Sequence, residues 1–414
     1  MVEENCSRVD EKKVRAILES RQINTYFQPV VAIASKSIIG FEAFSRVTGE
    51  FARCPDIRML FHKDLSPELI VNVDRLCRDK ALARYRSIHE THPDLLLYLN
   101  VNVDIMPHVD PDSAYLFEQI EQLGIAPQSV VVEGVSFAPD VERMAAFCAH
   151  FREHGLKVGL DGCAVDEPFN SAISRLKPDF IKINRSFFGD TERAEYSAKT
   201  LEGLISAADH VGASVIGCGV ETEAESIRLL MAGVNLQQGY YYTRGEERHV
   251  GDPAWMFREK IVETYDKYLK VKNRQVRRKK ERFVQIFKDV SSVCSKLSNR
   301  SEEWFEDGCK KLARTGEGII SLFVLDTTGR QITRRISSSL RQSASHPDVI
   351  LKTDIGVSHS VEDYVLYLDI GYEKFVTPPF VSPFTGEKAC LVSTPFFNIQ
   401  GDRYIVCVEM ALAG

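Results

Sequence analysis

The chain has 414 residues, of which 44% are hydrophobic and 27% charged, and these ordinary globular proportions exclude a disordered or fibrous protein. A net charge of -6 and an isoelectric point near 6.0 argue against a dedicated binder of nucleic acid or of membrane surfaces. No apolar run reaches about 18 residues and the N-terminus lacks the pattern of a signal peptide, so we expect a cytoplasmic protein with no membrane segment.

Short apolar segments alternate with helix-like patterns from about residue 24 to residue 245. This alternation, over that length, predicts a (β/α)8 barrel of the TIM type, with each strand followed by a helix. A doubly wound open sheet is the alternative, but no G-x-G-x-x-G follows the first strand. The expected strands are Tyr26–Ala32, Ile38–Val47, Leu95–Val101, Val130–Val135, Lys157–Asp161, Phe180–Asn184, Ala213–Cys218 and Gly239–Thr243.

The second half of the chain predicts a connecting helix and a small α+β domain. A helical pattern runs from Ala254 to Leu297, and its basic middle, Lys267 to Arg282, favours a solvated face over a site for nucleic acid or anionic lipid because no aromatic residues are interleaved. A helix over 301–315 and an antiparallel sheet beginning at Gly318–Leu325 follow. We expect a barrel domain at 10–250, a connecting helix at 251–299 and a sensory or dimerisation domain at 300–414.

One face of the connecting helix has the spacing of a helix seam. Its apolar residues alternate at spacings of four and three, as in the a and d positions of a coiled coil: Phe283, Phe287, Val290, Cys294 and Leu297. We expect a homodimer held through this face and the C-terminal domain. Because two heptads are few, the alternative is that the face packs on the C-terminal sheet of its own chain.

Oxygen-bearing side chains stand at the ends of four expected barrel strands: Glu42, Asn100, Glu133 and Asp161. Function in such barrels gathers at the C-terminal ends of the strands. Carboxylate and amide oxygens suit a hard cation, so this set predicts a site for one Mg²⁺ or Ca²⁺. The alternative for each residue alone is a helix cap or loop residue, and for the whole set a relic site held by its own hydrogen bonds.

The ordered motifs of the first 248 residues resemble the EAL domain, the barrel family that linearises the bacterial second messenger cyclic di-GMP. The matching segments are Tyr26-Phe27-Gln28-Pro29, Glu42-Ala43-Phe44-Ser45-Arg46, Asn100, Glu133, Leu160-Asp161, Ile181-Lys182-Ile183-Asn184-Arg185-Ser186-Phe187, Gly219-Val220-Glu221-Thr222 and Gln238-Gly239-Tyr240-Tyr241. The resemblance implies a phosphodiesterase barrel in which two cations activate water and stabilise the leaving oxygen.

Four positions depart from the pattern of this family, and all fall on its catalytic machinery. Gly162 replaces the second residue of a double aspartate, and Asn184 replaces the aspartate of K-I-D. Ser136 replaces the second glutamate of E-x-x-E. Cys218 stands where the family has the glutamate that is assigned as the base, and a thiol is a poor substitute because it is largely protonated at neutral pH and binds magnesium weakly.

The residues that the resemblance assigns to ligand binding are better kept than those that it assigns to cleavage. The expected nucleotide-binding residues are Gln28, Glu42, Arg46, Asp161, Lys182 and Gln238. We therefore predict a catalytically inactive EAL-type receptor or regulatory adaptor that takes cyclic di-GMP and acts on a protein partner that the sequence does not identify. The alternatives are a slow metal-dependent phosphodiesterase and an interaction module that no longer binds the nucleotide.

Two further features of the sequence are a pair of cysteines and a C-terminal segment with its own family resemblance. Cys163 and Cys218 both fall at the expected site, but without a nearby histidine they indicate core thiols rather than a redox or thiolate-metal centre. The C-terminal segment resembles Cache or PAS-like sensory domains through Phe323-Val324-Leu325-Asp326-Thr327-Thr328-Gly329-Arg330 and Ser382-Pro383-Phe384-Thr385-Gly386-Glu387. The carboxylate-binding R-x-Y of many Cache domains is replaced by Glu362-Asp363-Tyr364, which argues against a carboxylate ligand at that motif.

Overall fold

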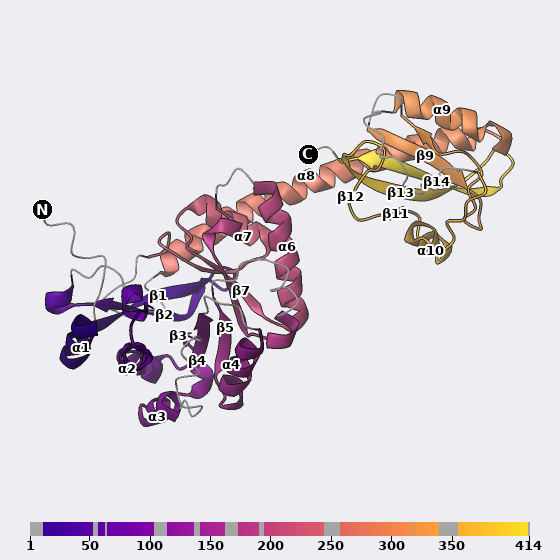
Figure 1. Cartoon of the computed structure of the whole chain (residues 1–414). Helices are drawn as coiled ribbons and strands as arrows, with labels where there is room; N and C mark the ends of the chain where they lie inside the picture. The colour runs from indigo at the N-terminus through magenta and orange to yellow at the C-terminus, as the bar shows by residue number, and fades with distance from the viewer. Residues whose placement is uncertain are drawn as a thin grey trace, which may run out of the picture. The chain divides into compact units, whose positions relative to one another are not determined.

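The computed structural model describes residues 11–52, 57–62, 64–102, 114–135, 141–161, 173–189, 194–243, 257–316, 318–338 and 355–412. Its internal contacts form two compact units, Met1–Asn273 and Arg274–Gly414 (Figure 1). Within the described segments, no helix combines the length and the apolar composition that crossing a bilayer requires.

The first unit is a closed barrel of strands in chain order from β1 to β8 (Figure 1). The strands are β1 (Ile23–Ala32), β2 (Ser37–Val47), β3 (Leu96–Asn102), β4 (Val130–Val135), β5 (Lys157–Leu160), β6 (Phe180–Ile183), β7 (Ser214–Cys218) and β8 (Leu236–Gln238). The helices of this unit are α1 (Glu11–Ser20), α2 (Pro67–Thr91), α3 (Ala114–Gln122), α4 (Val141–Glu153), α6 (Ala194–Val211) and α7 (Glu223–Ala232). The predicted α/β barrel is confirmed.

The first two strands correct the expectation that a helix follows every strand. β1 pairs antiparallel with β2 and with β8, whereas the pairs from β2 to β8 are parallel. Only a short turn at residues 33–36 joins β1 to β2. An antiparallel hairpin needs no crossover connection, so the four turn residues are sufficient.

The eighth strand lies earlier than Gly239–Thr243, where the sequence analysis placed it. β8 ends at Gln238, and Gly239 begins a turn in which the amide of Tyr242 donates to the carbonyl of Gly239 at 3.1 Å. A Cβ on Gly239 would lie 2.2 Å from the backbone of Val220, so only glycine permits this close approach. The run after the glycine is therefore a turn, and β8 closes the barrel by pairing with β1.

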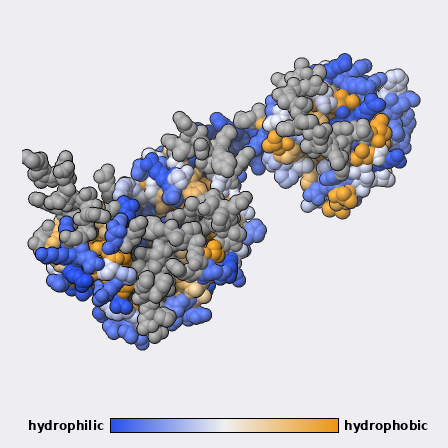
Figure 2. All heavy atoms as spheres, viewed as in Figure 1, coloured by the Kyte–Doolittle hydropathy of each residue, from blue (hydrophilic) through white to orange (hydrophobic). Residues whose placement is uncertain are grey.

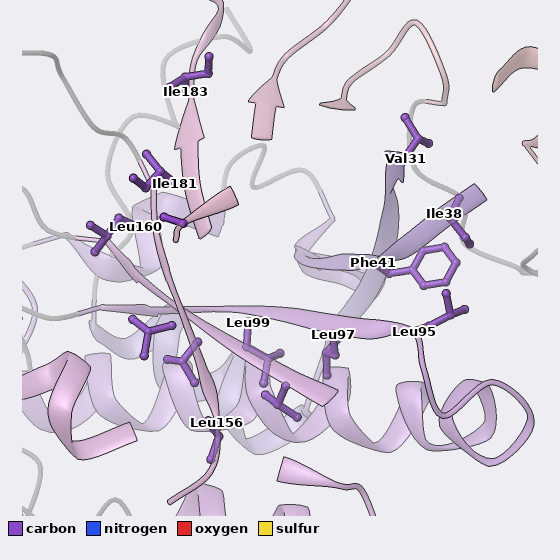
Figure 3. Packing of buried hydrophobic residues seen from close by; sticks show 14 of the residues in the cluster. Val31, Ile38, Phe41, Leu95, Leu97, Leu99, Leu156, Leu160, Ile181 and Ile183 are labelled. Carbon is purple, nitrogen blue, oxygen red and sulfur yellow. The ribbon is translucent and has the colours of Figure 1, made fainter. Parts of the chain in front are cut away.

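Strand alternation divides the barrel side chains into an outer and an inner set. Leu97 and Leu99 of β3 belong to the large core between the strands and the surrounding helices, and they project from the same side of their strand (Figure 3). Tyr98, between them, packs inside the barrel with Val30 and Ile216. Because side chains alternate along a strand, Asn100 shares the inward face of Tyr98. The barrel interior thus carries the polar residues at the strand ends.

A long helix, α8 (Arg258–Ser298), contributes to both units. Near its start Ile261 joins the barrel core, while the basic stretch at 273–282 is exposed. Farther along, Val290 and Leu297 are buried in the core of the second unit, and Phe287 packs against that core. The face expected as a dimer seam therefore packs within its own chain, which was the alternative considered above.

The second unit is an antiparallel sheet with the strand order β10-β9-β14-β13-β11, and β12 also pairs with β13. Its strands are β9 (Ile319–Leu325), β10 (Ile336–Ser337), β11 (Phe375–Val376), β12 (Phe380–Val381), β13 (Lys388–Phe397) and β14 (Arg403–Ala411), and its helices besides α8 are α9 (Phe305–Thr315) and α10 (Asp363–Asp369). One sheet face packs on α8 and α9, and the other packs on α10. The small sheet domain expected after the helix is confirmed.

The surfaces of the two units mix polar and apolar residues. Figure 2 shows mainly hydrophilic residues on the face in view, with hydrophobic ones interspersed between them. Scattered exposed apolar residues are normal for globular proteins, so they mark no particular site.

Candidate functional site

Glu42 is the centre of a buried polar cluster inside the barrel. Its side chain comes from β2, and the residue is only 4% exposed. Glu42 Oε1 accepts a hydrogen bond from Asn100 Nδ2 at 2.9 Å. Glu42 Oε2 accepts from Lys182 Nζ and from Gln238 Nε2, each at 2.7 Å. Strands β2, β3, β6 and β8 therefore converge on one carboxylate, although their residues lie far apart in the sequence.

Lys182 lies between two carboxylates. Its Nζ is 2.7 Å from Glu42 Oε2 and 2.6 Å from Glu133 Oε2, and all three residues are buried. Burial alone would lower the pKa of Lys182, but the charges of Glu133 and Glu42 raise it well above its ordinary value. Burial raises the pKa of Glu133 to about 8, against the opposing effect of Lys182. The Lys182 ammonium is thus charged, and it donates hydrogen bonds to both glutamates.

The four expected metal ligands differ in how they are used. Asp161, half-buried after β5, is close enough to act electrostatically on Glu133 and Lys182. Glu133 Oε1 is buried and has no hydrogen-bond partner in the described part of the chain. No group of three His, Cys, Asp or Glu side chains among the described residues is already arranged to hold a metal. All four side chains carry oxygen donors, which are the ligands that a hard cation prefers.

Two glutamines and a thiol form the side of the cluster nearest β8. Gln238 Nε2 also donates to Gln28 Oε1 at 3.0 Å, and Gln28 Nε2 donates to the carbonyl of Thr243 at 3.0 Å. Cys218 Sγ donates weakly to Gln238 Oε1 at 3.7 Å. Burial raises the pKa of Cys218 well above its ordinary value, so this thiol is neutral near pH 7.

Arg46 lies outside the buried cluster. Its residue is exposed, and its guanidinium carbon is 4.6 Å from the ring centroid of Tyr26. Arg46 shares a strand face with Glu42 because they are four residues apart on β2, a separation of about 14 Å at ~3.4 Å per residue. The structure therefore places Arg46 at the rim, above the buried carboxylates.

The positions that depart from the family pattern are only partly described. Asn184 is the N-cap of the short helix η5 (Arg185–Phe187), where its Oδ1 accepts from the amide of Ser186 at 3.0 Å. Its exposed side chain thus has a capping role. Ser136, Gly162 and Cys163 lie outside the described residues.

Sequence reasoning did not identify Tyr98 as a neighbour of the buried polar cluster. Its ring lies 5.4 Å from Lys182 Nζ, and its buried hydroxyl has no hydrogen-bond partner among the described residues. Burial is the main cause that raises the pKa of this phenol. The signal was available, since Tyr98 is two residues before Asn100 on the same strand and shares its face.

An ion-pair network at the rim was also missed. Arg185 Nε donates to Glu225 Oε1 at 2.6 Å, and Arg185 also pairs with Glu221. Glu225 Oε2 accepts from the amides of Glu221 and Thr222, which closes a capping box at the start of α7. The spacing Thr222-x-x-Glu225 is a sequence signature of that box.

Comparison with known proteins adds family information. Residues 11–244 match the family described as the EAL domain. YkuI of Bacillus subtilis, an uncharacterised EAL-domain containing protein, is 21% identical over 320 residues, which cover 75% of this chain and 76% of that protein. The probable cyclic di-GMP phosphodiesterase PdeB of Escherichia coli is 24% identical over 244 residues, which cover 56% of this chain and 44% of PdeB.

A solved structure matches both units of the fold. The crystal structure of YkuI in complex with its substrate c-di-GMP and calcium has a TM-score of 0.79 and 18% sequence identity, over 98% of this chain and 100% of that one. The likeness therefore extends beyond the barrel to the C-terminal sheet.

Proposed function

The chain belongs to the EAL domain family, and from that premise we propose that its barrel binds cyclic di-GMP without hydrolysing it, as a receptor or regulatory adaptor in cyclic di-GMP signalling. The observation that carries the proposal is Cys218. It occupies the position of the family's base, and its buried thiol has a raised pKa. A protonated thiol has no free lone pair of sufficient basicity to take a proton from water at neutral pH. Losing a general base typically costs about 10² to 10⁴ in rate.

Asn184 supports the same proposal. In the family an aspartate stands at this position, and here the neutral amide is engaged as the N-cap of η5. An amide supplies no negative charge to a second cation. The departure at Gly162 removes a further carboxylate. Together these changes leave donors for one cation rather than for a pair.

We propose that Glu42, Asn100, Glu133 and Asp161 hold one Mg²⁺ or Ca²⁺ when the nucleotide binds. Such a cation would offset the repulsion between the carboxylates of the site and the ligand phosphates. The support is the unpaired buried oxygen of Glu133 and the presence of calcium together with c-di-GMP in the YkuI crystal. Lys182 and Gln238 orient Glu42 through their hydrogen bonds, and Gln28 accepts a hydrogen bond from Gln238.

Calorimetric titration of the full chain with cyclic di-GMP, with and without Mg²⁺ or Ca²⁺, tests binding, and chromatography of the same mixtures tests for the linear product. We expect binding that strengthens with the cation, and no product. Turnover near about 1 s⁻¹, the low end of common enzyme rates, would contradict the proposal.

A reversal experiment separates loss of catalysis from misassignment of the site. Gly162→Asp, Asn184→Asp and Cys218→Glu combined should raise hydrolysis more than any one of them alone, because groups that act as a unit are non-additive. If the combined variant binds the nucleotide but still yields no product, these positions do not account for the inactivity.

A slow metal-dependent phosphodiesterase is the second candidate. The observation that favours it is the retained set of Glu42, Asn100, Glu133 and Asp161 around Lys182. The relative PdeB is a probable cyclic di-GMP phosphodiesterase. A measurable rate that disappears on chelation of the metal identifies this case. If calorimetry detects no binding of cyclic di-GMP with any cation, the chain is the third candidate, an interaction module that no longer binds the nucleotide.

Arg46→Ala tests where the nucleotide lies. A charged, bidentate contact to phosphate is worth about 1.5–3 kcal/mol, so we expect at least about tenfold weaker binding. Arg21→Ala, an exposed arginine before β1, is the matched control and should leave the affinity unchanged. An unchanged affinity in Arg46→Ala would move the ligand away from this rim.

We further propose that the C-terminal unit is a Cache/PAS-like sensory or dimerisation domain and that the chain forms a homodimer. Since Val290 and Leu297 are buried within their own unit, the contact would have to use exposed residues of α8 such as Val276 and Val284. Light scattering of the intact chain and of a Val284→Asp variant decides this. A monomer at tens of micromolar for the intact chain would overturn the homodimer.

A further inference from the structure

The segment Arg274–Arg282 of α8 is a basic surface of the second unit. Six of its nine residues are Lys or Arg and one is Glu, a net charge of +5, although the whole chain carries -6. Every residue of this basic segment is exposed. None of its Lys and Arg side chains forms a salt bridge within the part of the chain that the structure describes. The segment therefore presents positive charge that no carboxylate of the described chain balances.

Repulsion within the basic segment makes this charge unfavourable for the helix itself. Arg278 lies four residues from both Arg274 and Arg282, and like charges at this spacing are neighbours on a helix surface and destabilise it. Arg277 and Glu281 are the one pair of opposite charges at the same spacing in the segment. Carboxylates supplied by another molecule would relieve the repulsion.

An apolar stripe runs along the same stretch of helix. Val276, Phe283 and Phe287 are separated by seven and four residues, a spacing that places them on one side of a helix, and Val284 widens this stripe. Val276 and Val284 are 55% and 59% exposed, and Phe283 is half-buried. At the end of the stripe, Phe287 packs against the core of the second unit. One exposed valine marks no site, but an aligned stripe leaves apolar surface in water beside the basic residues.

We propose that this stripe of α8 docks an amphipathic helix of a protein partner, with apolar residues along the centre of that helix and carboxylates at its edges. Val276, Phe283 and Val284 pack against its apolar side. Lys280, four residues from each valine, and Arg277, seven residues before Val284, lie on the same side of α8 and pair with the carboxylates. The proposal rests on the adaptor role proposed above, and it defines the chemistry of the protein partner.

Other occupants fit the basic segment less well. It has no interleaved aromatic residues on which the bases of a nucleic acid could stack. A bilayer surface needs a broad apolar face, and two exposed valines do not supply one. A second copy of the chain would bring Arg277 and Lys280 against basic residues of the same kind. An acidic helix avoids that repulsion, so it competes with the homodimer contact proposed above.

The test is fluorescence anisotropy of a labelled synthetic peptide titrated with the full chain. The probe peptide has four heptads with Leu at the a and d positions and Glu at the e and g positions, and a control peptide has the same composition in an order that breaks the heptads. We expect the heptad peptide to bind at least about tenfold more tightly than the control peptide, and to bind more weakly in high salt.

Two results of this titration would overturn the proposal. One is that the heptad peptide does not bind at ~100 μM chain, or binds no better than the control peptide. The other is that a DNA duplex of similar length, or vesicles that contain phosphatidylserine, bind more tightly than the heptad peptide does. Either of these would replace the partner helix by nucleic acid or by anionic lipid as the occupant.

Charge reversal locates the contact on the chain. Arg277→Glu combined with Lys280→Glu should weaken binding of the heptad peptide at least about tenfold. The matched control is Lys311→Glu combined with Arg314→Glu on the exposed face of α9, which changes the net charge equally and at the same spacing, and should bind as the wild type does. Equal losses in the two double variants would show that only the overall charge matters, which overturns the assignment to α8.

A second variant tests the apolar contact without a change of charge. Val276→Ser combined with Val284→Ser alters exposed positions, so the fold should persist, and the heptad peptide should bind at least about fivefold more weakly. Unchanged affinity would overturn the docked helix. Light scattering of the chain without peptide reports on the homodimer, and calorimetry with cyclic di-GMP reports on the nucleotide. A chain that binds cyclic di-GMP but not the peptide therefore contradicts this inference alone.

Discussion

The barrel and the C-terminal unit each bury a basic side chain next to carboxylate, but they complete the pairing to different degrees. In the barrel, Lys182 touches Glu42 and Glu133 at 2.7 and 2.6 Å. In the C-terminal unit, Arg335 stands 3.8 Å from Glu409, and each side chain has an unpaired buried atom. A buried charge is tolerated only when it is paired and hydrogen-bonded.

This difference in pairing distance indicates that the two buried ion pairs contribute differently to their units. The contacts of Lys182 order the carboxylates at the strand ends in the absence of any ligand. The Arg335–Glu409 pair is held by Ser321 and by aromatic rings, yet one buried atom of each side chain has no hydrogen-bond partner among the described residues. Because its ion-pair contacts are shorter, we expect the first cluster to contribute more to the stability of its unit than the second does.

The largest expected effect is that of Lys182→Met. This change leaves Glu42 and Glu133 buried together without their shared cation, so the barrel should lose about 3–5 kcal/mol of unfolding free energy. Urea denaturation followed by hydrogen exchange of barrel peptides measures the loss in this unit.

The matched control is Lys12→Met on the exposed face of α1, which should change stability by less than about 0.5 kcal/mol. If Lys182→Met costs no more than this control, the buried cluster does not hold the barrel strands together.

A pair of double-mutant cycles compares the two clusters directly. The cycle of Lys182→Met with Glu133→Gln should give a coupling energy of about 2–3 kcal/mol, because the ammonium contacts the carboxylate at 2.6 Å. The cycle of Arg335→Met with Glu409→Gln should give about 1 kcal/mol, because the pair is looser. Equal coupling energies, from urea denaturation in metal-free buffer, would remove the distinction drawn here.

The smallest effect is expected at the barrel rim, where Glu225 is buried but the side chain of its partner Arg185 is 44% exposed. Although burial raises it, hydrogen bonds from the amide of Glu221 and from Arg185 lower the pKa of Glu225 overall. A lowered folded-state pKa stabilises above the unfolded value of about 4.5, and the stabilisation is lost as the pH falls through the folded value. Glu225→Gln should therefore cost about 1 kcal/mol at pH 7 and progressively less below about pH 4.5.

The measurement for this last prediction is the midpoint of urea unfolding from pH 7 down to pH 3.5. Glu223→Gln, an exposed glutamate in the first turn of the same helix, is the control. If Glu225→Gln lowers the unfolding free energy by the same amount at every pH in this range, the charge of Glu225 does not contribute to stability.

The sequence by itself determined the order of the elements and most residues of the barrel cluster. Apolar runs located seven of the eight barrel strands. Glu42, Asn100 and Glu133 could be grouped because parallel strand ends meet at one edge. The resemblance to the EAL domain also identified Lys182 and Gln238. These inferences succeed because alternation along a strand and the polarity of parallel strands are local rules.

Tertiary structure decided what depends on residues far apart in the chain. Three features depend on neighbours that no local pattern specifies. They are the antiparallel pairing of β1 with β2, the turn at Gly239 and the packing of the α8 face on the sheet of its own chain. The pair of Arg335 and Glu409 is the clearest case, since antiparallel pairing of β9 with both β10 and β14 brings the two charges together. Contacts of this kind depend on sheet order and register, and a sequence read residue by residue contains neither.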